Sequence, residues 1–154
     1  MKAYVITIRG NINSVQSANK CIDSGKLHGL KIEKFSAITP ADNPVELLKT
    51  RGISPIQFDE KYSRNENCIA AFLSHYALWE ACSKGKENFV IFEHDAIMVD
   101  RIPPACPNYV MNLGHPSYGK WNTPAQLGIN PLTTKRYFPG AHAYMVTPEG
   151  EDCW

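Results

Sequence analysis

The stretch NFVIFEHDAIMVD, residues 88–100, places an apolar run directly before a cluster of charged residues. Residues 89–92 are Phe-Val-Ile-Phe, the composition of a short strand that is buried on both faces. The run stops at Glu93-His94-Asp95. Acids at the end of a buried strand are typical of the carboxyl edge of an open α/β sheet, where such sheets bind ligands.

Sequence patterns on both sides of this stretch predict an alternation of strands and helices. Residues 3–8 (AYVITI) have the β-branched and aromatic content of a strand, and Asn13 with Gln16 has the spacing of a capping box for a helix that ends at Gly25 and Gly29. The other expected elements are a strand over residues 30–38, a short helix from Asn43-Pro44 to Arg51, a long helix from the capping box Ser63 to Glu66 to its end at Lys84-Gly85, and strands over residues 109–113 and 143–146. This order predicts an α/β fold with a mostly parallel sheet flanked by helices.

Length and composition limit the function classes. The chain has 154 residues, a net charge of +1 and no cluster of Lys and Arg, which indicates one domain over residues 1–154 and argues against nucleic-acid binding. No apolar run approaches the roughly 18 residues of a membrane span, and the apolar start is too short for a signal peptide. Five cysteines without a C-x-x-C pair favour reduced thiols over a disulfide framework or a zinc ribbon. We therefore expect a soluble, cytoplasmic protein, and its oligomeric state stays open.

The acidic cluster is a candidate metal site. If residues 89–95 are extended, Glu93 and Asp95 point to one side of the strand and His94 to the other. Paired carboxylates suit Mg²⁺ and Mn²⁺, which accept oxygen ligands and keep positions open for water and phosphate. The alternative is a solvated exit from the strand, with Asp95 capping a turn.

A second constellation lies in the predicted long helix, whose sequence FLSHYALWEACSKG spans residues 72–85. Ser74, His75 and Trp79 stand there among apolar residues. Because His75 and Trp79 are four residues apart, they share one face of the helix. They are either site residues or core residues that pack together.

Three segments, taken together, resemble a known family. FLSHYALW (residues 72–79), VIFEHDA (90–96) and PGAHAYMVTPEG (139–150) are similar, in this order, to glycosyltransferase family 25, which includes bacterial lipooligosaccharide galactosyltransferases and collagen galactosyltransferases. The family pattern is a Ser-His-x-x-x-Trp helix, a strand ending in Glu-Asp-Asp and a Gly-x-x-Ala-Tyr segment. The resemblance touches most of the chain, and these three motifs are its specific part.

The resemblance implies a glycosyltransferase A-type fold, an inverting reaction, a nucleotide-sugar donor such as a UDP-hexose, and Mn²⁺ (or Mg²⁺) at the acidic motif. Carried over by position, Glu93 and Asp95 match the outer acids and are the expected metal ligands. His142 is a further candidate ligand for the metal or the diphosphate, the alternative being a strand residue that faces solvent. The residues expected to form the donor pocket are Ser74, His75, Trp79, Gly140 and Tyr144.

The chain departs from the family pattern at His94, which stands where the family has its middle acid. An inverting transfer also needs a general base for the proton of the acceptor hydroxyl. Glu151 and Asp152 are acids near the end of the sequence, but nothing assigns either of them this role, so the catalytic residue stays unknown. Thr147-Pro148-Glu149 has the pattern of a helix start, although the sequence stops at Trp154.

These observations lead to one leading hypothesis and two alternatives. The first is a metal-dependent glycosyltransferase that moves a hexose, with galactose expected, from a nucleotide sugar to a saccharide acceptor, as in lipopolysaccharide-type glycan synthesis. The second is a degenerate, non-catalytic family member with a binding or assembly role, which His94 and the short carboxyl-terminal part favour. The third is a metal-dependent hydrolase that uses His94 and the acids.

Overall fold

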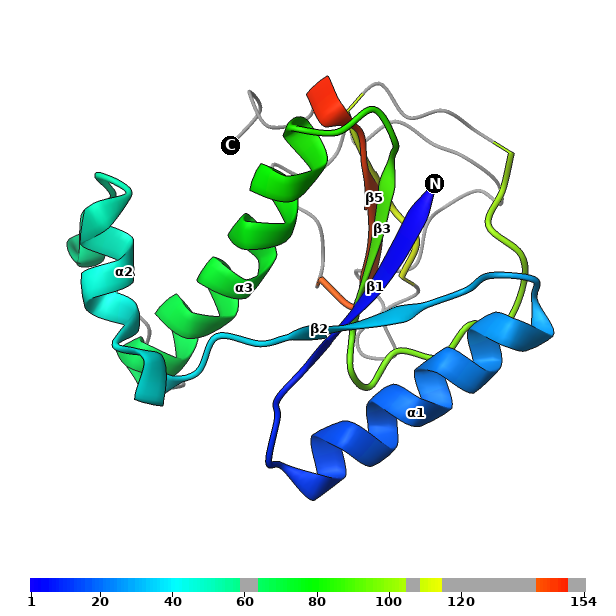
Figure 1. The fold of residues 1–154 in the computed structure, drawn as a ribbon, viewed down its shortest axis with the longest axis horizontal. Coiled ribbons are helices and arrows are strands. Elements are labelled where there is room, and N and C mark those ends of the chain that lie inside the picture. The colour runs from blue at the N-terminus through cyan, green and yellow to red at the C-terminus, as the bar shows by residue number, and fades with distance from the viewer. Residues whose placement is uncertain (59–63, 105–108, 115–140, 150–154) are drawn as a thin grey trace, which may run out of the picture.

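A five-stranded sheet between helices forms the centre of the molecule in the computed structural model, which describes residues 1–58, 64–104, 109–114 and 141–149 (Figure 1). The strands have the spatial order β2-β1-β3-β5-β4. In chain order the helices and strands are β1 (Lys2–Thr7), α1 (Ile12–Leu27), β2 (Glu33–Ser36), α2 (Pro44–Thr50), α3 (Asn65–Ser83), β3 (Phe89–Glu93), β4 (Val110–Asn112) and β5 (Ala143–Val146), with 3₁₀ turns at Pro40–Asp42 and Pro55–Gln57. The α/β class and the expected order of elements are confirmed.

The sheet is mixed, which corrects the expectation of a mostly parallel one. β1 pairs in parallel with β2 and β3, whereas β5 pairs antiparallel with both β3 and β4. Parallel neighbours need a crossover connection, usually a helix, and α1 and α3 lie in the connections that lead to β2 and β3. The sequence between β3 and β5 has no comparable helical pattern and is rich in Pro, Gly and Asn.

The two faces of the sheet pack against different helices. Side chains of a strand alternate between faces, so Val5 and Val90 join α1 residues in one buried cluster, while Ile6 and Ile91 join α3 residues in another. The α1 cluster contains Ala3, Val5, Ala18, Cys21, Ile32, Val90, Phe92, Met98, Ala143 and Met145. The α3 cluster contains Ile6, Leu78, Trp79, Cys82, Phe89, Ile91, Tyr144 and Val146. α1 and α3 therefore cover opposite faces of the sheet (Figure 1).

The start of α1 lies two residues earlier than the capping-box pattern predicts. Asn11, not Asn13, is the N-cap, and its side chain accepts a hydrogen bond from Ser14 N at 3.1 Å. Ser14 Oγ in turn accepts from Ile8 N, which ties the helix start to the end of β1. Gly25 lies within the helix rather than at its end. Gly29, with a φ of 77°, makes the turn after it.

The other helix ends agree with expectation at α2 but only in part at α3. Asn43 and Pro44 begin α2 as predicted, and Lys84 caps the end of α3. The N-cap of α3 is Arg64, and Ser63, at which the capping box was predicted, lies outside the described residues. At the far end of the chain, Pro148 and Glu149 have 3₁₀ geometry, and the residues that would continue the predicted helix lie outside the described residues. In the described segments, no helix is both long and apolar enough to cross a membrane.

Gly25→Ala should destabilise the fold even though alanine favours helices. A Cβ at Gly25 would lie 2.5 Å from Ile32 Cδ1 and 2.9 Å from the carbonyl oxygen of Leu30, a backbone atom that cannot rotate away. The helix propensity gained is about 1 kcal/mol. Overpacking of a tight site costs about 1–3 kcal/mol, so we expect a net loss in the free energy of unfolding, measured by urea titration.

Asn19→Ala is the matched control, because Asn19 is exposed on the same helix. This substitution is expected to leave the free energy of unfolding unchanged or to raise it by a few tenths of a kcal/mol, since alanine is the better helix former. A Gly25→Ala variant as stable as Asn19→Ala would contradict the close contact between α1 and the segment that enters β2.

Candidate active site at the carboxyl edge of the sheet

The candidate site lies at the edge of the sheet where β1, β2 and β3 end. These strands run in one direction, and β5 runs in the other, so the residue that precedes β5 reaches the same edge. The chain crosses from β1 to β2 through α1 and later reaches β3, on the other side of β1, through α3. This is the topological switch at which open α/β sheets bind ligands.

Glu93 and His142 are brought together by the β3–β5 pairing. The ladder pairs Ile91 with Tyr144 and Phe92 with Ala143, and the Glu93 N–H donates to the carbonyl oxygen of His142 at 2.9 Å. The side chains also meet, because His142 Nδ1 lies 3.2 Å from Glu93 Oε2. The predicted acid and the predicted histidine are therefore neighbours across two strands.

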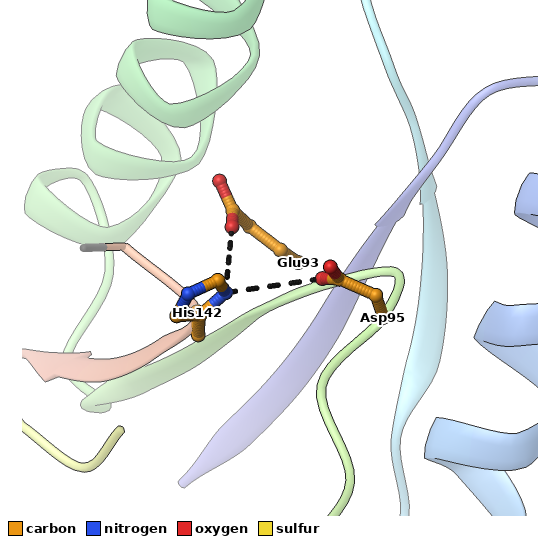
Figure 2. A group of neighbouring side chains, drawn as sticks. All are labelled: Glu93, Asp95 and His142. Carbon is orange, nitrogen blue, oxygen red and sulfur yellow. Dashed lines mark ion pairs between the residues drawn. The ribbon is translucent and has the colours of Figure 1, made fainter. Parts of the chain in front are cut away.

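Asp95 reaches the same place through a turn rather than through strand alternation. β3 ends at Glu93, and the Ala96 N–H donates to the carbonyl oxygen of Glu93 at 3.0 Å, which closes a turn over His94 and Asp95. Asp95 Oδ1 then lies 3.9 Å from His142 Nδ1. Figure 2 shows the imidazole facing both carboxylates. The predicted grouping is present, although the extended conformation invoked for it is wrong beyond Glu93.

Glu93, Asp95 and His142 form a group with the composition of a metal site. One ligand atom from each lies within 4.8 Å of the others. Two carboxylates and one imidazole suit Mn²⁺ or Mg²⁺, and three protein ligands leave coordination positions for water and phosphate oxygens. Among the described residues this is the one such group, and His94 is not part of it.

Behind Glu93 lies a hydrogen-bonded row of side chains from α3 and β5. Tyr144 OH accepts a hydrogen bond from Trp79 Nε1 at 2.7 Å and lies 2.8 Å from His75 Nδ1. The other ring nitrogen of that histidine, Nε2, lies 3.8 Å from Glu93 Oε1. His75 and Trp79 also pack together, with ring centroids 6.3 Å apart. The structure thus supports packing between these two residues. That either of them contacts the nucleotide-sugar donor remains a prediction.

Electrostatics in the site favour an ionised Glu93 and a protonated Tyr144. His75, which faces the carboxylate, lowers the pKa of Glu93; burial opposes this, and the nearby His142 and His94 add to the lowering. Burial raises the pKa of Tyr144 well above its usual value, against the hydrogen bond from Trp79, and the charge of Glu93 raises it further. The carboxylate is therefore charged at neutral pH, while the phenol keeps its hydrogen.

Ser74 is a structural connection between α3 and the segment after β2. Its side chain is buried, its Oγ accepts a hydrogen bond from Ile38 N at 2.8 Å, and it donates to the Ala70 carbonyl oxygen at 2.9 Å. The hydroxyl therefore already holds two protein partners. A role in shaping the donor pocket, as predicted from the sequence, would have to be indirect.

The loop after the acids is fixed to α1 by a residue that sequence reasoning missed. Met98 N donates to Ser24 Oγ at 2.9 Å, and Ser24 Oγ donates to the Cys21 carbonyl oxygen at 2.7 Å. Both Ser24 and Met98 are buried. The signal available in the sequence is a serine on the apolar side of the helix, one turn after Cys21.

Some predicted residues cannot be placed. Gly140, expected in the donor pocket, lies outside the described residues, as do Glu151 and Asp152, the acids considered for the general base. Tyr144, also expected in the donor pocket, is buried and its hydroxyl lies between His75 and Trp79. The donor pocket as a whole therefore remains a prediction.

Comparison with known families agrees with the motifs. The model of glycosyltransferase family 25 (LPS biosynthesis protein) matches residues 1–113. The chain belongs to glycosyltransferase family 25. No curated protein matches the chain. Membership implies a glycosyltransferase of lipopolysaccharide biosynthesis with a glycosyltransferase A-type fold, in agreement with the mixed sheet flanked by helices.

The matched range contains two of the three family motifs. The α3 motif with His75 and the acidic motif with Glu93 and Asp95 lie within residues 1–113, whereas His142 and Tyr144 lie beyond it. The place of these two residues in the site therefore depends on the structure, which pairs β5 with β3.

Ser74→Ala should destabilise the family 25 fold. Removal of the hydroxyl leaves the Ile38 N–H without its acceptor in a partly buried setting, a loss of about 1–3 kcal/mol in the free energy of unfolding. Urea unfolding followed by circular dichroism measures this loss. Ser83→Ala is the matched control, because within the described part of the chain Ser83 Oγ donates to the Glu80 carbonyl of its own helix and accepts no backbone N–H from another element. Equal stability of the two variants would contradict the structural role of Ser74.

Proposed function

We propose that this family 25 chain is a metal-dependent glycosyltransferase that moves a hexose from a UDP-sugar to a saccharide acceptor in lipopolysaccharide synthesis. The proposal depends on the convergence of Glu93, Asp95 and His142 at the carboxyl edge of the sheet. The family supplies the class of reaction and the nucleotide-sugar donor. Galactose as the sugar and inversion as the stereochemical course come from the resemblance of the motifs to galactosyltransferases.

The residues of the site fit a hard divalent cation. His75, with smaller effects of His142 and His94, lowers the pKa of Glu93 and so favours its ionised form. Asp95 has a largely exposed side chain (60%) that is open to a ligand from solvent. His142 presents Nδ1 to both carboxylates. A cation bound there would supply Lewis-acid stabilisation of the diphosphate as the bond to the sugar breaks.

The side chains have separable roles in this scheme. Asp95 and Glu93 bring two negative charges to the tip of β3, which favour a cation over a bare diphosphate. His142 can serve as a ligand only when Nδ1 is unprotonated, because a protonated imidazole would occupy the same space with its own hydrogen and charge. The turn over His94 and Asp95 sets the distance of the second acid from the first.

Asp95→Asn should remove Mn²⁺-dependent binding of UDP. Groups that only hydrogen-bond to a metal ligand typically contribute 10–100-fold to metal affinity. Loss of a direct ligand should therefore weaken Mn²⁺-dependent binding by at least about tenfold. Isothermal titration of the purified chain with UDP, with and without Mn²⁺, measures this effect. Asp100→Asn is the matched control, because Asp100 follows in the same loop but lies outside the metal group. We expect it to bind as the unmodified chain does.

Two results would contradict the proposal in different ways. UDP binding that is equal with and without Mn²⁺, or equal in Asp95→Asn and Asp100→Asn, would show that the proposed metal site takes no part in donor binding. Mn²⁺-dependent binding of UDP without hydrolysis or transfer of the sugar from UDP-hexoses to any saccharide would favour the non-catalytic alternative, which His94 at the position of a family acid supports.

A further inference from the structure

The row of hydrogen-bonding groups behind Glu93 has a defined direction. The indole N–H of Trp79 can only donate, so Tyr144 OH accepts there at 2.7 Å. The phenol has one hydrogen left to donate, and its other partner among the described residues is His75 Nδ1, at 2.8 Å. When the imidazole is neutral and the phenol places its hydrogen on this partner, Tyr144 donates and Nδ1 is the acceptor of the imidazole.

A fixed acceptor at Nδ1 determines the tautomer of His75. A neutral imidazole whose Nδ1 accepts a hydrogen bond carries its own hydrogen on Nε2. Nε2 lies 3.8 Å from Glu93 Oε1, so in this tautomer the N–H dipole faces the carboxylate at a distance somewhat longer than a hydrogen bond. The row thus runs from Trp79 through Tyr144 and His75 to Glu93, with each hydrogen directed toward the acid.

The two oxygens of Glu93 then have different surroundings. Oε1 faces His75 on the α3 side, while Oε2 faces His142 at 3.2 Å on the side of the metal group. The side chain of His75 is 12% exposed, whereas that of Glu93 is 36% exposed. The inner oxygen, Oε1, therefore faces the covered imidazole of His75, and the outer oxygen, Oε2, faces the metal group.

We propose that Tyr144 is a positioning residue, which fixes the tautomer of His75 and through it the orientation of the Glu93 carboxylate toward the metal group. This inference deepens the proposed function and rests on it. Tyr144 touches neither the metal group nor a substrate in this scheme. Ligating carboxylates are commonly oriented by groups behind them, and loss of such a group typically weakens metal affinity 10–100-fold.

Tyr144→Phe tests the proposal, because it removes the hydroxyl and keeps the ring. The first readout is the tautomer of His75 in the metal-free chain, from nitrogen-15 NMR of the imidazole, with the signal assigned by its loss in His75→Asn. The unmodified chain should show the Nε2–H tautomer. Tyr144→Phe should show a mixture of both tautomers, since Nδ1 has lost its donor. A merely structural role of the hydroxyl would not shift this signal.

The second readout is Mn²⁺ affinity by calorimetry. Tyr144→Phe should bind Mn²⁺ about 10–100-fold more weakly than the unmodified chain. Tyr76→Phe is the matched control: Tyr76 lies on α3 with its ring near that of Trp79, but among the described residues the hydroxyl bonded to His75 Nδ1 is that of Tyr144. The control should keep both the tautomer and the affinity, and thermal unfolding confirms that each variant is folded.

The outcomes are distinguishable. An Nδ1–H tautomer in the unmodified chain would overturn the proposal without any variant, even if Tyr144→Phe failed to fold. An unchanged tautomer in folded Tyr144→Phe, or an affinity equal to that of Tyr76→Phe, would overturn it as well. Absence of Mn²⁺ binding in the unmodified chain would instead overturn the proposed function, and the positioning role toward a metal would fall with it.

Discussion

The burial of β3 on both faces is the constraint on which the rest of the site depends. Phe89 to Phe92 are all buried, and their side chains alternate between the α1 and the α3 side of the sheet. Glu93 continues the series of Phe89 and Ile91 and therefore emerges on the α3 side, where His75 is. A shift of one residue in the pairing with β1 would turn this carboxylate toward α1 and away from its partners.

The antiparallel direction of β5 is the second feature on which the geometry of the site depends. Because it is antiparallel to β3, the residue before its first position lies beside the last position of β3. His142 can therefore join a site built from an earlier part of the chain. A parallel strand in the same place would have carried this histidine to the far edge. The mixed sheet is thus a condition for the site.

Much of the fold follows from local patterns in the sequence, and the deviations have physical causes. Strands such as Ala143–Val146 and helices with strong apolar spacing were predicted because local composition determines them. The N-cap of α1 was misplaced because two asparagines stand two residues apart, and only the contact of Ser14 with the end of β1 selects Asn11. Strand direction in β5 depends on tertiary pairing, which no local pattern encodes.

The candidate site was predicted as a set of residues rather than as a geometry. Motifs in the sequence indicate Glu93, Asp95 and His142, and the structure brings them together, but Asp95 arrives through a turn and not through an extended chain. Tyr144 was assigned to the donor pocket, whereas its hydroxyl is buried between His75 and Trp79. Such contacts join residues nearly 70 positions apart in the chain, and their partners appear only after α3 packs against the sheet.

The loop from Glu93 to Met98, which carries Asp95, is attached to the fold at both ends, and this affects how much conformational entropy is lost when a ligand binds. The Ala96–Glu93 turn holds one end of the loop, and the hydrogen bond from Met98 to Ser24 holds the other, so Asp95 stands on a span of very few free dihedral angles. Ordering one residue of backbone costs about 1–2 kcal/mol, and here folding has already met that cost. A ligand that arrives at Asp95 therefore retains more of its contact energy as affinity, because the loop has little conformational entropy left to lose.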